Sequence, residues 1–439
     1  MKKNTLFRFV VGVSLGWLLG HPSEAQTTVL SLDEAIEQGL KTNFNVQIAQ
    51  KNEDITTLQI YKGNAGMLPT ILANAAFGSS FNYVNQSFFD GREINRFGRQ
   101  YSPSASVGLS WTLYDGKLMQ TNFMALQMQG QQAKHQTQLI VQNTVSQIMS
   151  TYFDILRQKQ SVEFLQTIIK YYDERLLITE QRWQIGRASK LDYLQSKTDL
   201  TTQLLELTQA KNLLASAKIR LNTLLNRDTT LDFDVRDVPS FRSDYPINQL
   251  IEQAKTSNPE LLILQKSIEL GSIAEKQSFS FTLPRLSLNS SFAYSSTNNN
   301  AGLFLLNQNT GLNTGLTLTW SIFDGQRIRR NIETAKLRTE LAKEQKANVF
   351  NQILGDLSTT YNQFKADQEL LAIEEENRAL AEENLTISLE KYRLGSSTIL
   401  ELSDAQRRFD TSLNRLVNAR YNVKISELEL LRLSGELIK

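Results

Sequence analysis

An internal repeat limits the fold of this chain more than any other feature of its sequence. Residues 111–116 read Trp-Thr-Leu-Tyr-Asp-Gly, and residues 320–325, which lie 209 positions later, read Trp-Ser-Ile-Phe-Asp-Gly. A Leu-Pro pair at 68–69 recurs at 283–284, with a spacing of 215 positions. The change of spacing between these two matches indicates that the halves differ in one loop. A repeat of this length predicts two copies of one structural unit.

The positions of proline leave long stretches of both halves free of helix-breaking residues. None of the seven prolines lies in 104–238 or after Pro284. We therefore expect each half to contain a helix of about 30 residues that ends at Pro69 or Pro284, and later a helix of roughly 68 residues followed by one of nearly 40. The break between the last two helices is predicted at Gly186 and at Gly395.

Apolar residues along the longest predicted helices recur at steps of four and three, which is the spacing of helices that pack side by side. At 1.5 Å per residue, a helix of this length extends about 100 Å, which predicts a rod. The residues of this pattern are Val141, Val145, Ile148, Tyr152 and Ile155 in the first half, and Phe350, Leu354, Leu357, Tyr361 and Phe364 in the second.

Two segments between these helices in each half alternate strictly between apolar and small polar residues. Val107, Leu109 and Leu113, for example, alternate with serine, glycine and threonine. The pattern predicts two strands in each half, with the intervening residues 85–101 and 296–313 in exposed loops. Strands of a membrane barrel face lipid on one side and a lumen on the other, whereas strands at the edge of a soluble sandwich also alternate. Four strands alone cannot shield an apolar face from water, which favours the membrane interpretation.

The first 25 residues are typical of a secretory signal peptide. Lys2, Lys3 and Arg8 precede a short apolar run, and small residues before position 26 provide a cleavage site. The run is too short to span a bilayer as a helix, and no later run is longer, so we expect any membrane insertion to use strands. The remaining chain divides into a first repeat at 26–227 (helix, two strands, long helix, helix), a linker at 228–246 and a second repeat of the same order at 247–439.

Composition excludes several classes of function. The net charge is only +2, which gives no electrostatic basis for binding nucleic acid. Cysteine is absent, and one of the two histidines, His21, lies in the predicted signal peptide. We find no phosphate-binding loop, nucleophile elbow or metal-ligand spacing. The sequence therefore predicts a protein without cofactor or metal that is not an enzyme.

The ordered combination of these features resembles the TolC-like outer-membrane efflux proteins. The closest local matches are residues 392–405 (Tyr-Arg-Leu-Gly-Ser-Ser-Thr-Ile-Leu-Glu-Leu-Ser-Asp-Ala) and 183–192 (Trp-Gln-Ile-Gly-Arg-Ala-Ser-Lys-Leu-Asp). The resemblance implies a mainly α fold with a small membrane β part. Three identical chains would form a twelve-stranded barrel among the lipids of the outer membrane, continued into the periplasm by a long α-helical barrel.

The resemblance also implies a function and partners. The protein would be a passive exit duct of an efflux or type I secretion system, and would dock to a periplasmic adaptor (membrane fusion) protein and an inner-membrane pump. An alternative is a non-conducting structural or interaction protein that spans the envelope. The docking surface would lie at the two predicted turns, whose exposed residues are Gly186, Arg187, Gly395 and Ser396.

The resemblance places acidic residues where the duct narrows, and the corresponding positions here are Asp192, Glu401 and Asp404. Carboxylates crowded into one ring would raise one another's pKa. A structural role is also open for two of them, because Ser189 and Thr398 precede Asp192 and Glu401 with the spacing of a capping box. Asp404 lies one turn further into its helix and cannot cap, which makes it the better candidate for the pore.

Aromatic residues in the repeated motif are predicted to lie at the interface of the membrane with water. Such residues flank the apolar band of membrane strands. They are Trp111 and Tyr114 in the first half, and Trp320 and Phe323 in the second.

Overall fold

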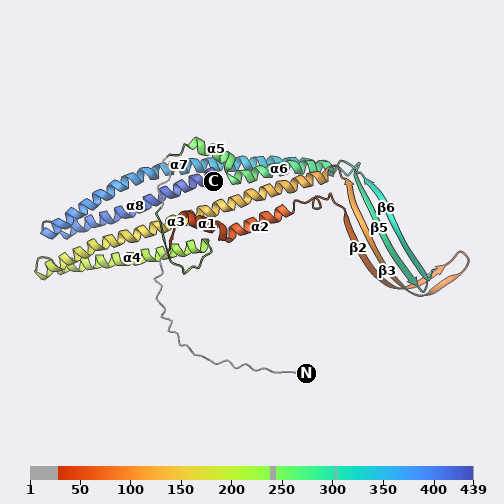
Figure 1. Ribbon diagram of the computed structural model, residues 1–439, viewed down its shortest axis with the longest axis horizontal. Helices are drawn as coiled ribbons and strands as arrows, with labels where there is room; N and C mark the ends of the chain where they lie inside the picture. Colours follow the sequence, from red (N-terminus) through yellow and green to blue (C-terminus); the bar gives the residue numbers. More distant parts are fainter. Residues whose placement is uncertain (1–27, 238–243, 302–303, 439) are drawn as a thin grey trace, which may run out of the picture.

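The computed structural model describes residues 28–237, 244–301 and 304–438. The predicted signal peptide, 1–25, lies outside these residues, as does 238–243 of the predicted linker. Long helices form a rod, and a curved sheet extends from one of its ends (Figure 1). This sheet has four strands. Among the described residues, no helix has both the length and the apolar character needed to cross a membrane.

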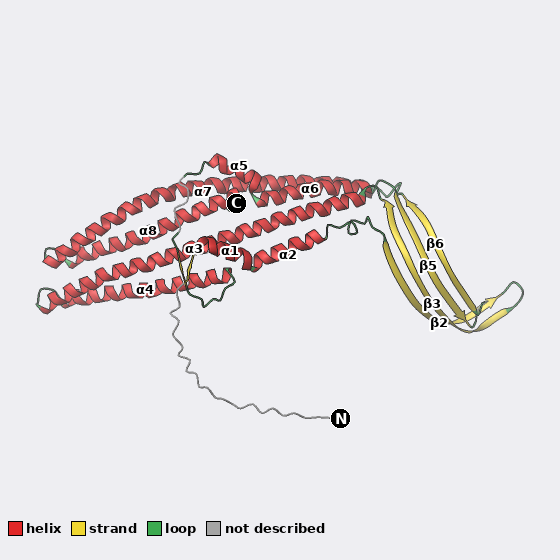
Figure 2. Cartoon of the chain, viewed as in Figure 1, coloured by secondary structure: helices red, strands yellow, loops and turns green. Residues whose placement is uncertain are grey.

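The same order of elements occurs twice along the chain (Figure 2). The first half contains β1 (Thr28–Leu30), α1 (Leu32–Thr42), α2 (Phe44–Leu58), β2 (Thr70–Ser87), β3 (Glu93–Tyr114), α3 (Leu118–Gln184) and α4 (Lys190–Leu224). The second half contains β4 (Phe233–Val235), α5 (Ile247–Ser257), α6 (Pro259–Ser280), β5 (Arg285–Asn299), β6 (Leu306–Thr319), α7 (Arg327–Leu394) and α8 (Ile399–Ser434).

The long helices agree with the sequence prediction. α3 has 67 residues and α7 has 68, and the helices that follow them have 35 and 36. α3 packs against α4, and α7 packs against α8, so each half forms a long helical hairpin. α3 also contacts α6 and α8, which joins the two halves side by side.

The prediction of one helix of about 30 residues before each strand pair was wrong. Each is two helices, interrupted at Asn43 in the first half and at Asn258 in the second. Each asparagine caps the second helix, because its side-chain oxygen accepts from the backbone N–H two residues later at 2.9 Å. Its side-chain amide also donates to a carbonyl near the end of a neighbouring helix. Asn43 donates to Leu224 O at the end of α4 at 2.8 Å, and Asn258 donates to Leu433 O near the end of α8 at 2.9 Å. The break thus satisfies backbone groups of two helices at once.

Part of the predicted linker is ordered, which the sequence pattern did not indicate. Its strand β4 pairs in parallel with β1. Phe233 and Val235 of β4 are buried against α3 in a cluster that includes Tyr152. The linker therefore attaches the start of the first half to the middle of the rod.

The sheet has the order β2-β3-β5-β6, and all three pairings are antiparallel. The strands are longer than predicted. β2 and β3 remain paired as far as Ser87 and Glu93, so only the turn between them interrupts a segment that was predicted as a loop. The second predicted loop is also mostly strand, since β5 ends at Asn299 and β6 begins at Leu306. Polar strand residues satisfy their backbone groups in the ladder here, which their turn-like composition concealed.

The two faces of the sheet differ as the alternation predicted. One face exposes large apolar side chains, among them Ile71, Phe77, Phe292, Leu312 and Leu318. The other face is a shallow hollow with many small or polar side chains, including Asn74, Gly108, Ser110, Asn289 and Thr317. β2 and β6 are the open edges of this sheet within one chain.

The repeated Trp-x-x-aromatic-Asp-Gly motif connects each strand pair to its long helix. The indole N–H of Trp111 donates to Met67 O at 3.2 Å, and Trp320 donates to Thr282 O at 3.1 Å. The aspartates then cap the helices: Asp115 accepts from the Met119 N–H, and Asp324 accepts from the Ile328 N–H. The residues after each aspartate have positive φ, namely Gly116, Lys117, Gly325 and Gln326. The motif is thus a strand-to-helix turn, which explains why its residues recur.

Candidate functional site at the tip of the helical rod

The two turns that connect the long helices lie side by side at the end of the rod farthest from the sheet (Figure 1). We call this end the tip, residues 172–206 and 385–410. Gly186 has a φ of +77° and Gly395 one of +81°, as the prediction of a glycine break requires. In both turns the next residue donates its N–H back to the last helical turn, from Arg187 to Arg182 O at 2.7 Å and from Ser396 to Lys391 O at 2.9 Å.

The predicted docking residues Gly186, Arg187, Gly395 and Ser396 are all exposed. The turns also expose two matched pairs of apolar side chains that sequence reasoning missed. Ile185 and Leu191 flank the first turn, and their counterparts Leu394 and Leu400, 209 positions later, flank the second; all four are at least two-thirds exposed. Their position beside a glycine at the same repeat spacing was the available signal. Exposed apolar side chains repeated at one end of a molecule are typical of a protein contact surface.

Asp192 and Glu401 form the capping boxes that the sequence offered as a structural role. The Asp192 carboxylate accepts from the Ser189 N–H at 3.1 Å, and the Ser189 hydroxyl accepts from the Asp192 N–H at 3.1 Å. Thr398 and Glu401 make the same two contacts at 3.3 Å. Both carboxylates therefore begin the last helix of a half.

Asp404 does not cap, as predicted, but it is not an isolated charge. Its carboxylate forms ion pairs with Arg408 at 2.7 Å and with Arg407 at 3.2 Å, both on the same helix. The hydrogen bond from Arg408 holds the pKa of Asp404 below its usual range. This direction is opposite to the one expected for a carboxylate crowded by like charges.

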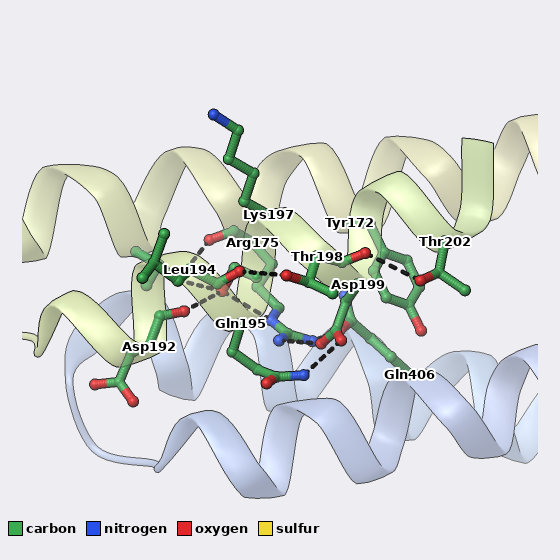
Figure 3. Close-up of polar contacts among 12 residues, drawn as sticks. Tyr172, Arg175, Asp192, Leu194, Gln195, Lys197, Thr198, Asp199, Thr202 and Gln406 are labelled. Atoms are coloured by element: carbon green, nitrogen blue, oxygen red, sulfur yellow. Dashed lines mark hydrogen bonds and ion pairs between the residues drawn. The ribbon is translucent and has the colours of Figure 1, made fainter. Parts of the chain in front are cut away.

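A buried arginine joins three helices just inside the turns (Figure 3). Arg175 of α3 is only 1% exposed. Its guanidinium donates to Asp199 of α4 at 2.6 Å, to Gln406 of α8 at 2.7 Å and to Ser196 of α4 at 3.3 Å. A buried charge is tolerated only with such partners, so this contact set fixes the relative position of the two hairpins.

A second polar contact lies one turn further from the tip. The Tyr172 hydroxyl of α3 donates to Asp410 of α8 at 2.8 Å. Burial raises the pKa of Asp410 to about 6, and the charge of Glu206 adds to this effect although the tyrosine bond opposes it. Burial also raises the pKa of Tyr172, so its hydroxyl stays protonated and donates at neutral pH.

The turns themselves are also linked across the two halves. Arg182 of the first half donates to Tyr392 O at 3.0 Å, and the Tyr392 hydroxyl lies 3.0 Å from the Thr179 hydroxyl. Arg393 forms an ion pair with Glu174 of α3. Sequence reasoning missed these residues, because nothing in a helical repeat distinguishes a polar residue at a helix contact from one in solvent.

The predicted interface aromatics lie at the opposite end of the rod, where the strands meet the helices. Tyr114 and Phe323 are exposed at the ends of the same motif that holds Trp111 and Trp320, and both tryptophans are also exposed. The structure therefore brings these four residues to one level of the molecule, far from the tip.

We expect Asp410 to reduce the stability of the folded chain at neutral pH. Its folded pKa of about 6 lies above the ordinary value of 3.8, so its contribution is most favourable below pH 4 and is lost as the pH rises through 6. Asp410→Asn keeps an acceptor for Tyr172 and should stabilise the protein at pH 8 by roughly 2 kcal/mol, with no gain at pH 4. Thermal unfolding at both pH values measures this.

The matched control is Asp404→Asn, on the same helix, which should not produce this pH dependence. Difference infrared spectroscopy should also show a carboxyl band that titrates near pH 6 and disappears in Asp410→Asn. A band that titrates near pH 4 would contradict the assignment.

Comparison with known proteins identifies the family. The family described as outer membrane efflux protein matches residues 35–227 and 250–436, which together form most of the chain. The outer membrane protein TolC of Escherichia coli K12 is 24% identical over 454 residues, with 100% of this chain and 87% of the relative covered. The toluene efflux pump outer membrane protein TtgC of Pseudomonas putida is 22% identical, with 92% of this chain and 83% of the relative covered.

Solved structures share the fold. The CmeC outer membrane channel of Campylobacter jejuni aligns with a TM-score of 0.77 at 16% identity, covering 99% of this chain and 95% of that one. The outer membrane protein VceC of Vibrio cholerae aligns with a TM-score of 0.75 at 15% identity, covering 92% and 96%. The predicted fold class, a tandem-repeat subunit of a channel with strands and long helices, is confirmed. The chain belongs to the outer membrane efflux protein family, whose members are channels of the outer membrane that extend into the periplasm.

Proposed function

We propose that this protein is the passive exit duct of an efflux or type I secretion system and that it works as a closed homotrimer. The observation that carries the proposal is the open sheet with one apolar and one polar face. In lipid the backbone groups of β2 and β6 must be paired, and a neighbouring copy supplies the missing strand. Barrels of about eight strands are filled by side chains. Twelve strands from three copies leave a water-filled lumen.

The contacts between the two halves support the proposal that the next copy repeats them. In α8, Leu413 is 2% exposed because it packs against the first half, whereas its counterpart in α4, Leu204, is 45% exposed. In α3, Tyr171 packs against Phe409, whereas its counterpart in α7, Leu380, is 59% exposed. The surface of α7 thus corresponds to the surface of α3 that packs against the other half, and the surface of α4 corresponds to that of α8. In α7 and α4, however, these surfaces are exposed. A second copy that repeats the internal contact would cover both, and such a head-to-tail contact closes a ring.

Gly325 indicates the same contact at the strand-to-helix turn. A Cβ atom at Gly116 would lie 2.6 Å from Ser280 O and 2.7 Å from the Leu283 Cβ, both in the second half. A Cβ atom at its counterpart Gly325, with the same φ of +70°, would meet nothing within 4 Å. By the repeat, the residues that fill this space would be Ala65 and Leu68 of the next copy.

The tip is proposed to dock a periplasmic adaptor protein, through which an inner-membrane pump delivers cargo. Its support is the repeated apolar surface at Ile185, Leu191, Leu394 and Leu400 around two exposed turns. Glu401 and Asp404 are proposed to line the narrowest part of the duct together with Asp192. Capping does not prevent this role, because capping uses one oxygen of the carboxylate of Asp192 or Glu401 and leaves the other free. We infer no chemical step, and so no enzyme activity.

Substitution of Gly325 should disrupt assembly rather than the fold of the chain. Gly325→Ala places a methyl group where the next copy is expected, and should lower the yield of trimers in native mass spectrometry by at least as much as Gly116→Ala does. Gly91→Ala, at a φ of +82° with open space, is the control for backbone strain alone, about 1–2 kcal/mol. Trimer yields that are equal for Gly325→Ala and Gly91→Ala would argue against the proposed contact.

The channel should conduct in planar bilayers and prefer cations. A lumen that narrows at carboxylates favours cations, so the double variant Glu401→Gln/Asp404→Asn should shift the reversal potential under a salt gradient toward zero selectivity. Both replacements keep the helix, since glutamine at position 401 can still complete the capping box. Asp192→Ala should instead cost stability of roughly 1 kcal/mol, as lost caps do.

Two results would contradict these assignments. Absence of conductance from correctly assembled trimers would favour a structural protein that spans the envelope without conducting. Unchanged selectivity in the double variant would place Glu401 and Asp404 outside the lumen while leaving the duct itself intact.

The turns can be tested separately from the barrel. Gly186→Val and Gly395→Val put a β-branched residue at positive φ, which should reshape the tip, whereas asparagine tolerates this conformation and serves as the matched control. Cross-linking to the cognate adaptor should fall in the valine variants and persist in Gly186→Asn and Gly395→Asn, with normal trimer yield throughout. Equal cross-linking in all four variants would exclude the tip as the docking surface.

A further inference from the structure

The outer end of the β2–β3 hairpin carries a ladder of aromatic side chains on the apolar face of the sheet. Phe97 pairs edge-to-face with Tyr83 across the strands, with ring centroids 5.2 Å apart, and Tyr101 stacks with Phe77 at 6.2 Å. Between these pairs the position opposite Phe81 is occupied by Arg99. A single cation therefore stands within an otherwise apolar, outward-facing row.

The backbone of Arg99 is held by a hydrogen bond, and its side chain lies over an aromatic ring. Its N–H donates to the Asn300 side-chain oxygen at 2.7 Å. Its guanidinium lies over the Phe81 ring at 4.4 Å and near the Tyr101 ring at 5.7 Å. Cation–π contacts of this kind use the charge of the guanidinium and leave its N–H groups available to donate to another partner.

Among the described residues, the guanidinium groups of the other two arginines in the strands donate to protein oxygens, whereas the guanidinium of Arg99 does not. Arg96 donates to Asn300 O, and Arg285 donates to Thr112 at 3.0 Å. Within the described residues, the Arg99 guanidinium has no hydrogen bond and no ion pair. The four strands contain a single acidic residue, Glu93, which is six positions away along the same strand.

The depth of Arg99 can be estimated from the inner aromatic level. Arg99 and Trp111 lie on the same face of β3, twelve positions apart. At about 3.3 Å per residue this is roughly 40 Å along the strand. A strand tilt of about 40° reduces it to roughly 30 Å along the membrane normal, slightly more than the apolar band of about 25 Å in outer-membrane barrels. Arg99 therefore lies at the level of the lipid headgroups of the outer leaflet.

We propose that Arg99, with the rings of Phe81 and Tyr101, forms a binding site for a phosphate group in the headgroup of an anionic outer-leaflet lipid. Guanidinium binds phosphate through two parallel hydrogen bonds, and the exposed ring of Phe77, which lies nearer to the level of Trp111 than Arg99 does, provides apolar surface for the acyl chains below. Such a site would surround the barrel once per chain and hold a lipid at a fixed depth. The inference rests on the strands being the membrane part, but not on conductance or docking.

The test is lipid retention by the purified trimer. Trimers are incubated in detergent with diphosphoryl lipid A, monophosphoryl lipid A or phosphatidylcholine, and bound lipid is counted by native mass spectrometry. Wild type should retain diphosphoryl lipid A most and phosphatidylcholine least. Arg99→Gln should reduce retention of diphosphoryl lipid A roughly tenfold, the factor expected when a charge-assisted pair is lost. Arg99→Lys should retain an intermediate amount of diphosphoryl lipid A, because lysine keeps the positive charge but lacks the two parallel N–H donors of the guanidinium.

Arg96→Gln is the matched control, three positions away on the opposite face of the same strand, and should retain lipid as wild type does. Inorganic phosphate should not displace the lipid, because the free ion lacks the acyl chains. Normal conductance of Arg99→Gln in planar bilayers separates this inference from the proposed function. Retention that is unchanged in Arg99→Gln, equally reduced in Arg96→Gln, or abolished by inorganic phosphate would overturn the proposal.

Discussion

The structure depends on one constraint, that a strand edge in lipid must find a hydrogen-bonding partner. The described part of one chain contributes four strands to this sheet and leaves β2 and β6 open. All other features follow from the need to repeat the chain around an axis. The tandem halves supply one internal contact, and in the proposed trimer the same contact between copies closes the ring. A closed barrel therefore needs more than one chain, and in the proposed trimer the next copy would cover exposed leucines such as Leu204 and Leu380.

The junction motif shows how a short sequence couples the two parts. Its tryptophan holds the segment before the first strand of the pair, and its aspartate caps the long helix. The two residues of positive φ after the aspartate turn the chain from the strand into the helix. Each role needs a particular residue type, so the motif recurs in both halves while the surrounding sequence has diverged. The ends of the strands and the start of the rod are thereby joined by the same seven residues in each half, 111–117 and 320–326.

Most of the architecture was predictable because it follows from the periodicity of apolar residues and from the positions of glycine and proline. Three features report backbone geometry directly. They are the spacing of Gly186 and Gly395, the absence of proline from the longest helices, and the alternation of apolar and polar residues along the strands. The breaks at Asn43 and Asn258 were missed because a capping asparagine resembles any polar helix residue until its partner, the end of another helix, is known. The contacts of Arg175 and Asp410 could not be predicted either, since they depend on which faces of α3, α4 and α8 meet. The site was thus located by its glycines, but its electrostatics came only from the packing.

The asparagine joints also determine how the wall of the rod can move. α2 and α4 lie end to end beside the unbroken α3, and α6 and α8 lie end to end beside α7, with the joints at Asn43 and Asn258. Along the rod, two columns are therefore single continuous helices, α3 and α7. The two columns beside them are each made of two helices that meet at a joint. A segmented column bends at its joint without breaking an internal helical hydrogen bond, whereas a continuous one must flex as an elastic beam. We therefore expect displacements of the tip to bend the segmented columns at the level of Asn43 and Asn258, whereas α3 and α7 continue unbroken past this level.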